Sequence, residues 1–253
     1  EDLRHLIVEG GESEDVADRT INSLGWRNLT KMNLTMSGRR ISLLDDVLSE
    51  VVLDMMASKW KRALHRRIGS FLADNWEKGD GGADEAARHL HQGGLEEKAA
   101  EMFEVAGDRR WQFSDYGGAL EDYKTAAELT AGGPQIAFLQ LKLARARLAV
   151  YEPAACRGSL RRAWEQADRT ALDWLIYAVS LTGANILLSL GEIEQAADWL
   201  ERLRDSLPST SRQADVIEIE ARIEAHRGNL AEATEKFERC SERTDHFGNP
   251  EGY

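Results

Sequence analysis

Small and bulky apolar residues recur at fixed positions through the second half of the chain. A cassette of thirteen residues occurs five times, at residues 94–106, 114–126, 151–163, 191–203 and 228–240. Each copy has a turn former or small break at its first position, a small residue at its sixth, a bulky apolar residue at its tenth and usually a small one at its thirteenth. The sixth, tenth and thirteenth positions share one face of a helix. A small side chain there lets a neighbouring helix approach and the bulky one fills the gap, so the cassette predicts a helical repeat.

The spacing of the cassettes agrees with stacked helix pairs. Successive sixth positions are 20, 37, 40 and 37 residues apart, at Ala99, Ala119, Cys156, Ala196 and Ala233. Repeats of two helices recur about every 34 to 47 residues, which the last three steps match. The first step is too short for two helices and two turns. We therefore predict one long helix, from about Leu95 to Phe113, that ends one repeat and begins the next.

The first section, residues 1–56, has a different pattern. We predict a helix from Ser13 to Leu24, then two short alternating apolar runs that Ser37-Gly38 separates and that pair as a hairpin. A helix followed by a small hairpin is typical of a winged-helix module. The helix contains three acidic residues and one arginine, which favours a structural module over a DNA reader. DNA binding by this section stays open as a third hypothesis.

The remaining chain divides into two further sections. Residues 57–82 are predicted to form a linker helix, from about Ala57 to Trp76, and a joint with three glycines within Gly79–Gly82. Residues 83–253 are the repeat array, in which glycines mark most of the turns.

The cassettes resemble degenerate tetratricopeptide repeats, and SDYGGALEDYKTAAEL, from Ser114, is the copy most similar to that family's second helix. The stretch Ile41–Val105 resembles the segment that follows the ATPase module in bacterial STAND-class signalling ATPases, including LuxR-type and antibiotic-regulator-type transcription factors. There a winged-helix-like piece, a helix with Leu-His-Arg-Arg and tetratricopeptide-like repeats follow one another, and Leu64–Arg67 reproduce that helix signature. The resemblance implies an all-α, superhelical tetratricopeptide-like repeat array, preceded by a small winged-helix-like module.

Composition and charge narrow the class of function. The formal net charge of −12 disfavours nucleic acid as the main partner, because phosphate contacts need clustered Lys and Arg. No apolar run approaches the roughly 20 residues of a membrane helix. The two cysteines lack Cys-x-x-Cys spacing, so we expect reduced thiols in a cytoplasmic protein. Because the chain starts at Glu1 without methionine or an apolar leader, we expect a fragment excised from a longer protein.

One local stretch departs from the acidic average. Six basic residues alternate with apolar ones at helical spacing: Lys59, Lys61, Arg62, His65, Arg66 and Arg67. We favour an amphipathic helix whose basic face is solvated or docks on an acidic surface. A role in binding nucleic acid or a nucleotide phosphate is the alternative.

No catalytic motif is apparent in the sequence. A Gly-x-x-x-x-Gly-Lys-Ser/Thr loop, a His-Glu-x-x-His pair and a Gly-x-Ser-x-Gly elbow are all absent. His89 and His91 are two residues apart, which places them on different sides of a helix and is unsuitable for a metal pair. The consecutive carboxylates lie near predicted helix starts, where the helix dipole favours them. We predict that this fragment is not an enzyme and holds no cofactor and no metal, whether or not its parent carries an ATPase.

The surface of such a repeat array is the remaining place for function. The first helix of each pair lines a concave groove that can hold a peptide or a partner's helix. The predicted groove helices are 135–150, 171–190 and 211–227. Their candidate partner-binding residues are Gln140, Lys142, Arg145, Tyr177, Asn185, Glu218 and Arg222.

The sequence therefore predicts an interaction or ligand-sensing domain of a larger ATP-dependent signalling or transcriptional regulator, which controls its activation or assembly. The expected partner is a protein or peptide, including the ATPase core of the same polypeptide, and neither a membrane nor nucleic acid. A stand-alone tetratricopeptide adaptor is the alternative. A carboxylate-binding groove would need clustered Lys, Arg and Asn on successive helices, which Lys142, Arg145 and Asn185 supply only thinly.

Overall fold

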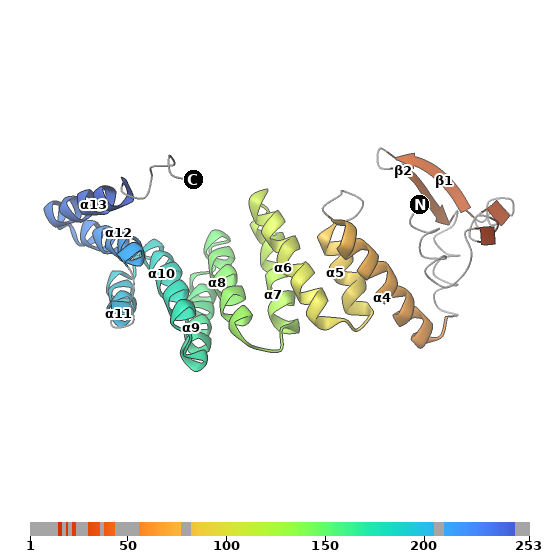
Figure 1. The fold of residues 1–253 in the computed structure, drawn as a ribbon, viewed down its shortest axis with the longest axis horizontal. Helices are drawn as coiled ribbons and strands as arrows, with labels where there is room; N and C mark the ends of the chain where they lie inside the picture. Colours follow the sequence, from red (N-terminus) through yellow and green to blue (C-terminus); the bar gives the residue numbers. More distant parts are fainter. Residues whose placement is uncertain are drawn as a thin grey trace. The chain divides into compact units, whose positions relative to one another are not determined.

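The computed structural model describes residues 15–16, 19, 22–23, 30–35, 38–43, 56–76, 82–204 and 210–245 (Figure 1). The chain forms two compact units, Glu1–Ala106 and Gly107–Tyr253, and each is described by itself. The three sections expected from the sequence, 1–56, 57–82 and 83–253, stay predictions. Most of the predicted joint at Gly79–Gly82 lies outside the described residues.

The first unit contains the predicted hairpin. Strand β1 (Thr30–Thr35) pairs antiparallel with β2 (Gly38–Leu43), with Thr35 opposite Gly38. This antiparallel pairing confirms the predicted hairpin. Within the predicted helix 13–24, the described residues are helical: Asp15, Val16, Arg19, Asn22 and Ser23. The winged-helix module, and DNA binding by it, stay predictions.

Two helices of the first unit pack closely. Helix α4 (Ser58–Asn75) matches the predicted linker helix, and α5 (Ala83–Gln92) lies against it. A Cβ atom on Gly69 would lie 2.7 Å from the backbone nitrogen of Leu90, so only glycine permits this approach. Two residues of the Leu-His-Arg-Arg signature join the helices: His65 contacts His89, and Arg66 donates to the carbonyl oxygen of Gly93. The signature therefore serves packing between α4 and α5.

The histidine pair makes this contact sensitive to pH. The Nδ1 atoms of His65 and His89 are 2.8 Å apart, so one ring donates a proton and the other must accept it in its neutral form. Burial, and then His65, lower the pKa of His89 below its usual 6.5; Glu85 opposes the shift and Arg88 adds to it. A histidine whose folded pKa is depressed stabilises the fold fully above its unfolded pKa. That stability is lost as the pH falls from 6.5 toward the folded pKa.

We expect amide hydrogen exchange in α4 and α5 to become faster as the pH falls from about 7.5 to about 5, after correction for intrinsic exchange rates. His89→Gln should flatten this dependence, because glutamine can accept a hydrogen bond without gaining a charge. His91→Gln, an exposed position on the same helix, is the matched control and should leave the dependence as it is. An unchanged pH dependence in His89→Gln would show that other groups cause it.

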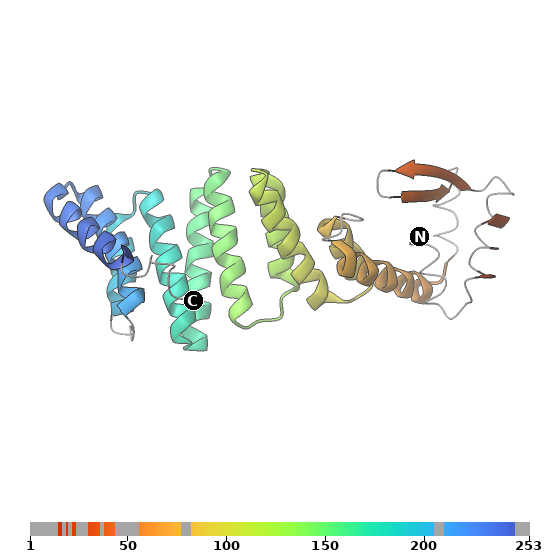
Figure 2. The ribbon, with the colours of Figure 1, turned by 45° about the horizontal axis from the view of Figure 1, so that its top comes forward.

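A run of helices continues into the second unit. Helix α6 (Glu96–Gln112) begins in the first unit and ends in the second, and it confirms the predicted long helix. The helices that follow it are α7 (Tyr116–Leu129), α8 (Pro134–Ala149), α9 (Pro153–Thr170), α10 (Asp173–Ser189), α11 (Ile193–Arg204), α12 (Thr210–Arg227) and α13 (Leu230–Asp245). Neighbours pack as pairs, α8 with α9, α10 with α11 and α12 with α13 (Figures 1 and 2).

The cassette positions explain this packing. All five sixth positions are buried, and so are four of the five tenth positions: Phe103, Tyr123, Leu160 and Leu200. The last tenth position, Phe237 on α13, is 41% exposed. The cassettes of α9 and α11 enter the main core, which also takes Leu175 and Val179 from α10. The cassette therefore builds the helix interfaces, as its pattern predicts.

The first cassette position has its own geometric requirement. In every copy it lies in the left-handed region, with φ of 73°, 62°, 61°, 77° and 84° at Gly94, Ser114, Tyr151, Gly191 and Gly228. A residue other than glycine pays roughly 1–2 kcal/mol for that conformation. This is why glycine opens three of the five cassettes, and it leaves backbone strain at Ser114 and Tyr151.

Candidate binding surface on the first-helix layer

The first helices of three successive pairs form one layer in the second unit. Helix α8 contacts α10, and α10 contacts α12. These helices coincide with the predicted groove helices 135–150, 171–190 and 211–227. We call α8, α10 and α12 the first-helix layer.

An aromatic stack joins α8 to α10. The rings of Phe138 and Trp174 have centroids 5.8 Å apart and planes inclined by 19°. Both residues lie near the N-termini of their helices, so α8 and α10 run in the same direction. Trp174 stays 46% exposed, although an exposed tryptophan forfeits its large apolar burial. The stack thus fixes the ring and leaves much of it open to a ligand.

Polar pairs join α10 to α12. The Tyr177 hydroxyl donates to Asp215 Oδ2 at 2.6 Å near the start of both helices. Closer to their ends, Arg222 Nη1 donates to Asn185 Oδ1, whose amide nitrogen donates to the Leu181 carbonyl oxygen at 3.1 Å. These pairs order the side chains without need of a ligand.

Helix α8, the first helix of the layer, contacts the end of α6. Lys142 Nζ lies 2.6 Å from Asp108 Oδ2 and 5.7 Å from the ring centre of Tyr123. The Arg145 guanidinium carbon lies 4.9 Å from the ring centre of Trp111. Lys142 is thus neutralised, whereas Arg145 stays exposed over an aromatic ring.

The structure places the seven predicted site residues unequally. Six are grouped on the layer, four of them in the pairs above; Arg145 and Glu218 are exposed. Gln140 is 8% exposed and lies on another face of α8, with the buried Ala137 and Ala144. A role of any of the seven in binding a partner stays a prediction.

Sequence reasoning missed Phe138, Trp174 and Asp215. The helical period could have indicated two of them, because residues three or four apart share a helix face. Phe138 precedes Lys142 by four residues, and Trp174 precedes Tyr177 by three. Asp215 is found only by its contact with Tyr177, 38 residues away.

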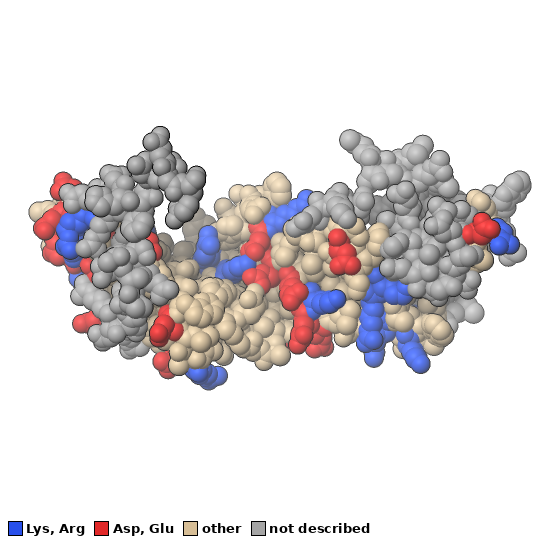
Figure 3. All heavy atoms as spheres, in the orientation of Figure 1, with Lys and Arg blue, Asp and Glu red and all other residues tan. Residues whose placement is uncertain are grey.

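Charge is distributed unevenly along the layer. Among the described side chains of the layer, the exposed Asp215 and Glu218 lie toward the helix N-termini, where the aromatic rings are, and the exposed Arg145 and the half-buried Arg222 lie nearer the C-termini. Over α7 and α8, on the face drawn in Figure 3, acidic and basic side chains are interspersed.

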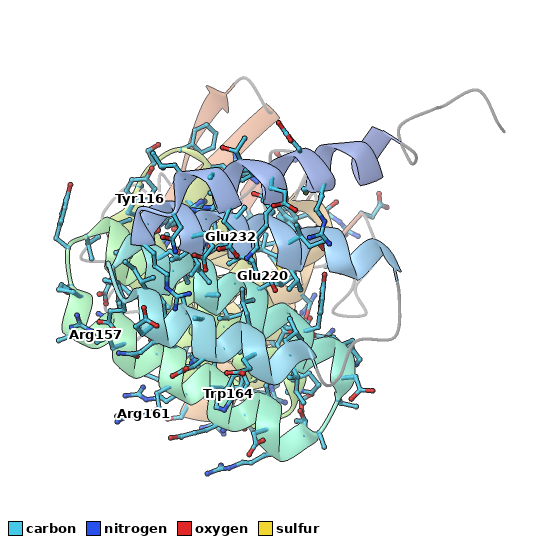
Figure 4. The ribbon with its side chains drawn as sticks, turned by 90° about the vertical axis from the view of Figure 1, so that its left-hand side faces the viewer. Tyr116, Arg157, Arg161, Trp164, Glu220 and Glu232 are labelled. Atoms are coloured by element: carbon cyan, nitrogen blue, oxygen red, sulfur yellow. The ribbon has the colours of Figure 1, made fainter. Side chains whose placement is uncertain are left out.

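The second helices present a different surface. The rings of Trp164 on α9 and Trp199 on α11 lie 5.1 Å apart and pack against the core. Figure 4 shows Arg157 and Arg161 of α9 pointing outward, and Arg157 pairs with Glu192. Trp164 and Trp199 therefore differ from Trp174 of the layer, whose ring is half exposed.

Few side chains in the described part of the chain are suited to chemistry other than binding. Burial raises the pKa of the Cys156 thiol and of the Cys240 thiol, which disfavours the nucleophilic thiolate. No cluster of three or more His, Cys, Asp and Glu side chains among these residues is placed to hold a metal. None of the helices within these ranges has the length and apolar character that a bilayer crossing requires.

Comparison with known proteins supports the fold. No protein-family model matches the chain, and no curated protein sequence matches it significantly. Among solved structures, the chain is similar to nearly identical TPR-like repeats from a Podosopora anserina protein assigned as a kinesin light chain, with 16% identity over 77% of this chain and 100% of that one and a TM-score of 0.52. It is also similar to the MamA protein, with 19% identity over 76% and 97% of the two chains and a TM-score of 0.50. Together with the antiparallel helix pairs, these likenesses show an all-α, tetratricopeptide-like helical repeat array.

Proposed function

We propose that the chain binds a polypeptide segment of a protein partner through the first-helix layer. The observation that carries this proposal is the half-exposed Trp174, fixed by its stack on Phe138. Binding energy concentrates in a few residues, and tryptophan is prominent among them. Ordered polar pairs on either side reduce the entropy that a ligand must remove.

The test is a peptide selection on the intact chain. We expect dodecapeptides selected from a random phage-displayed library to bind Trp174→Ala at least tenfold more weakly in fluorescence anisotropy titrations. Tyr151→Ala is the control, because Tyr151 is 89% exposed and lies outside the layer. Peptides that bind Trp174→Ala as tightly as the unsubstituted protein would place the binding surface elsewhere, and a selection that yields no binder would also count against the proposal.

The finer part of this proposal concerns the parent protein. We propose that the array is the sensing arm of a larger cytoplasmic ATP-dependent regulator, on the strength of the resemblance across Ile41–Val105. A stand-alone adaptor fits the same fold equally well. Coding sequence upstream of Glu1 distinguishes them: a Gly-x-x-x-x-Gly-Lys-Ser/Thr loop supports the regulator, and an immediate start codon supports the adaptor.

A further inference from the structure

The half of the layer near the helix N-termini combines aromatic rings with carboxylates. We call Phe138, Trp174, Tyr177, Asp215 and Glu218 the aromatic-acidic site. We propose that this site binds a lysine or arginine side chain of the partner, so that the partner's segment is cationic. This inference rests on the proposed function and names the class of segment that the layer takes.

Two contacts and the helical spacing place the five side chains next to one another. Phe138 stacks on Trp174, and Tyr177 follows Trp174 by one helical turn on the same face of α10. Tyr177 reaches Asp215 on α12, and Glu218 follows Asp215 by three residues, which again is one turn on one face. The site therefore spans three helices without a break.

The aromatic part suits a cation. A lysine or arginine head group is attracted to the face of an aromatic ring, most strongly to that of tryptophan. Phe138 orients the indole, and 46% of Trp174 remains open to solvent. An apolar side chain would also pack here, so the carboxylates decide between the two.

Both carboxylates leave acceptor capacity for a cation. Asp215 uses Oδ2 to accept from Tyr177, and its second oxygen accepts no hydrogen bond from the described residues. Glu218 makes no hydrogen bond or ion pair with a described residue. After burial, Glu218 and then Asp215 raise the pKa of Cys240, which indicates a negative local potential. A bound cation relieves the repulsion between these two like charges.

Among the described side chains of α12, the arginine nearest to Glu218 in sequence does not neutralise it. Arg222 lies one turn beyond Glu218, but its guanidinium donates to Asn185, and it makes no ion pair with a described acidic residue. The net charge of −12 adds a long-range attraction for a basic segment. Charge complementarity thus favours a basic segment at this half of the layer and an acidic one only at the half with Arg145.

The test is a charge exchange between protein and peptide. In a dodecapeptide selected on the intact chain, each Lys or Arg is replaced by Glu, and both peptides are titrated against Glu218→Lys. We expect Glu218→Lys to lower the affinity for the basic peptide at least tenfold. The same variant should bind the Glu-substituted peptide at least tenfold more tightly than the unsubstituted protein does. Glu121→Lys is the matched control, because it changes the net charge equally at an exposed position on α7, outside the layer. It should alter neither affinity by more than about twofold.

The outcomes separate the two proposals. Peptides that depend on Trp174 but lack Lys and Arg, or that bind Glu218→Lys unchanged, would overturn the cationic anchor and leave the proposed function standing. Selected acidic peptides whose affinity depends on Arg145 would likewise overturn the cationic anchor and leave the proposed function standing. Equal losses in Glu121→Lys and Glu218→Lys would show only general charge attraction and would also overturn the anchor. Failure of every peptide to depend on Trp174 would overturn both.

Discussion

Gly183→Ala should lower the free energy of unfolding by about 3 kcal/mol, because α10 has no room for a methyl group at this position. A Cβ atom on Gly183 would lie 1.9 Å from Cζ3 and 2.5 Å from Cε3 of Trp199 on α11. The indole packs against the core and against Trp164, so it cannot move aside without disturbing both. Equilibrium urea denaturation, followed by circular dichroism, measures the loss.

Gly158→Ala is the control for this prediction. Gly158 also lies inside a helix, α9, but a Cβ atom there would meet nothing within 4 Å. Alanine is favoured over glycine inside a helix by roughly 0.5–1 kcal/mol, so this variant should be more stable. If both variants gained stability, α10 and α11 would be farther apart than the structure has them.

Leu160→Ala should cost about 3 kcal/mol, whereas Phe237→Ala should cost about 1 kcal/mol or less. Both residues occupy the tenth cassette position. Leu160 is 2% exposed in the main core, so its truncation leaves a cavity, while Phe237 on α13 is 41% exposed and leaves none of that size. Urea denaturation of the two variants under identical conditions gives the comparison.

An equal loss in the two variants would contradict this account. It would mean that Phe237 is covered in solution as fully as Leu160, by another segment or another molecule. A sedimentation velocity measurement over a range of concentrations distinguishes these two explanations, because only contact with another copy depends on concentration.

If the layer binds a basic segment, its ordered pairs have a functional consequence. The bonds from Tyr177 to Asp215 and from Arg222 to Asn185 hold α10 and α12 together before any ligand arrives. A ligand that bridges Trp174 and Glu218 would add a further link across the same two helices. Binding would then stabilise the array by mass action, in proportion to the ligand's occupancy.

Local periodicity was enough to predict the helices and the hairpin. The three helices of the layer, the long helix α6 and the paired strands β1 and β2 all lie where the pattern places them. A helix face depends on residues three and four apart, and a hairpin depends on neighbours across a turn, so both can be recognised in a short stretch of chain.

The same pattern could not assign partners to polar side chains. Lys142 meets Asp108 from 34 residues away, and Arg222 meets Asn185 from 37 residues away. Gln140 is a polar residue of α8 like Arg145, yet Gln140 is buried and Arg145 is exposed. Which of these groups is engaged or exposed depends on how the helices are offset and rotated against one another.

The sequence by itself determined the repeat, its helix faces and the turn or break that opens each cassette, because these follow from residue types and from spacing within one helix. Only the tertiary structure decided that Trp174 is stacked and half open, that Glu218 stands without a described ion partner, and that Phe237 differs from Leu160 in burial. These properties arise where side chains from different repeats meet, and the position of one repeat against the next is a result of packing that no single cassette contains.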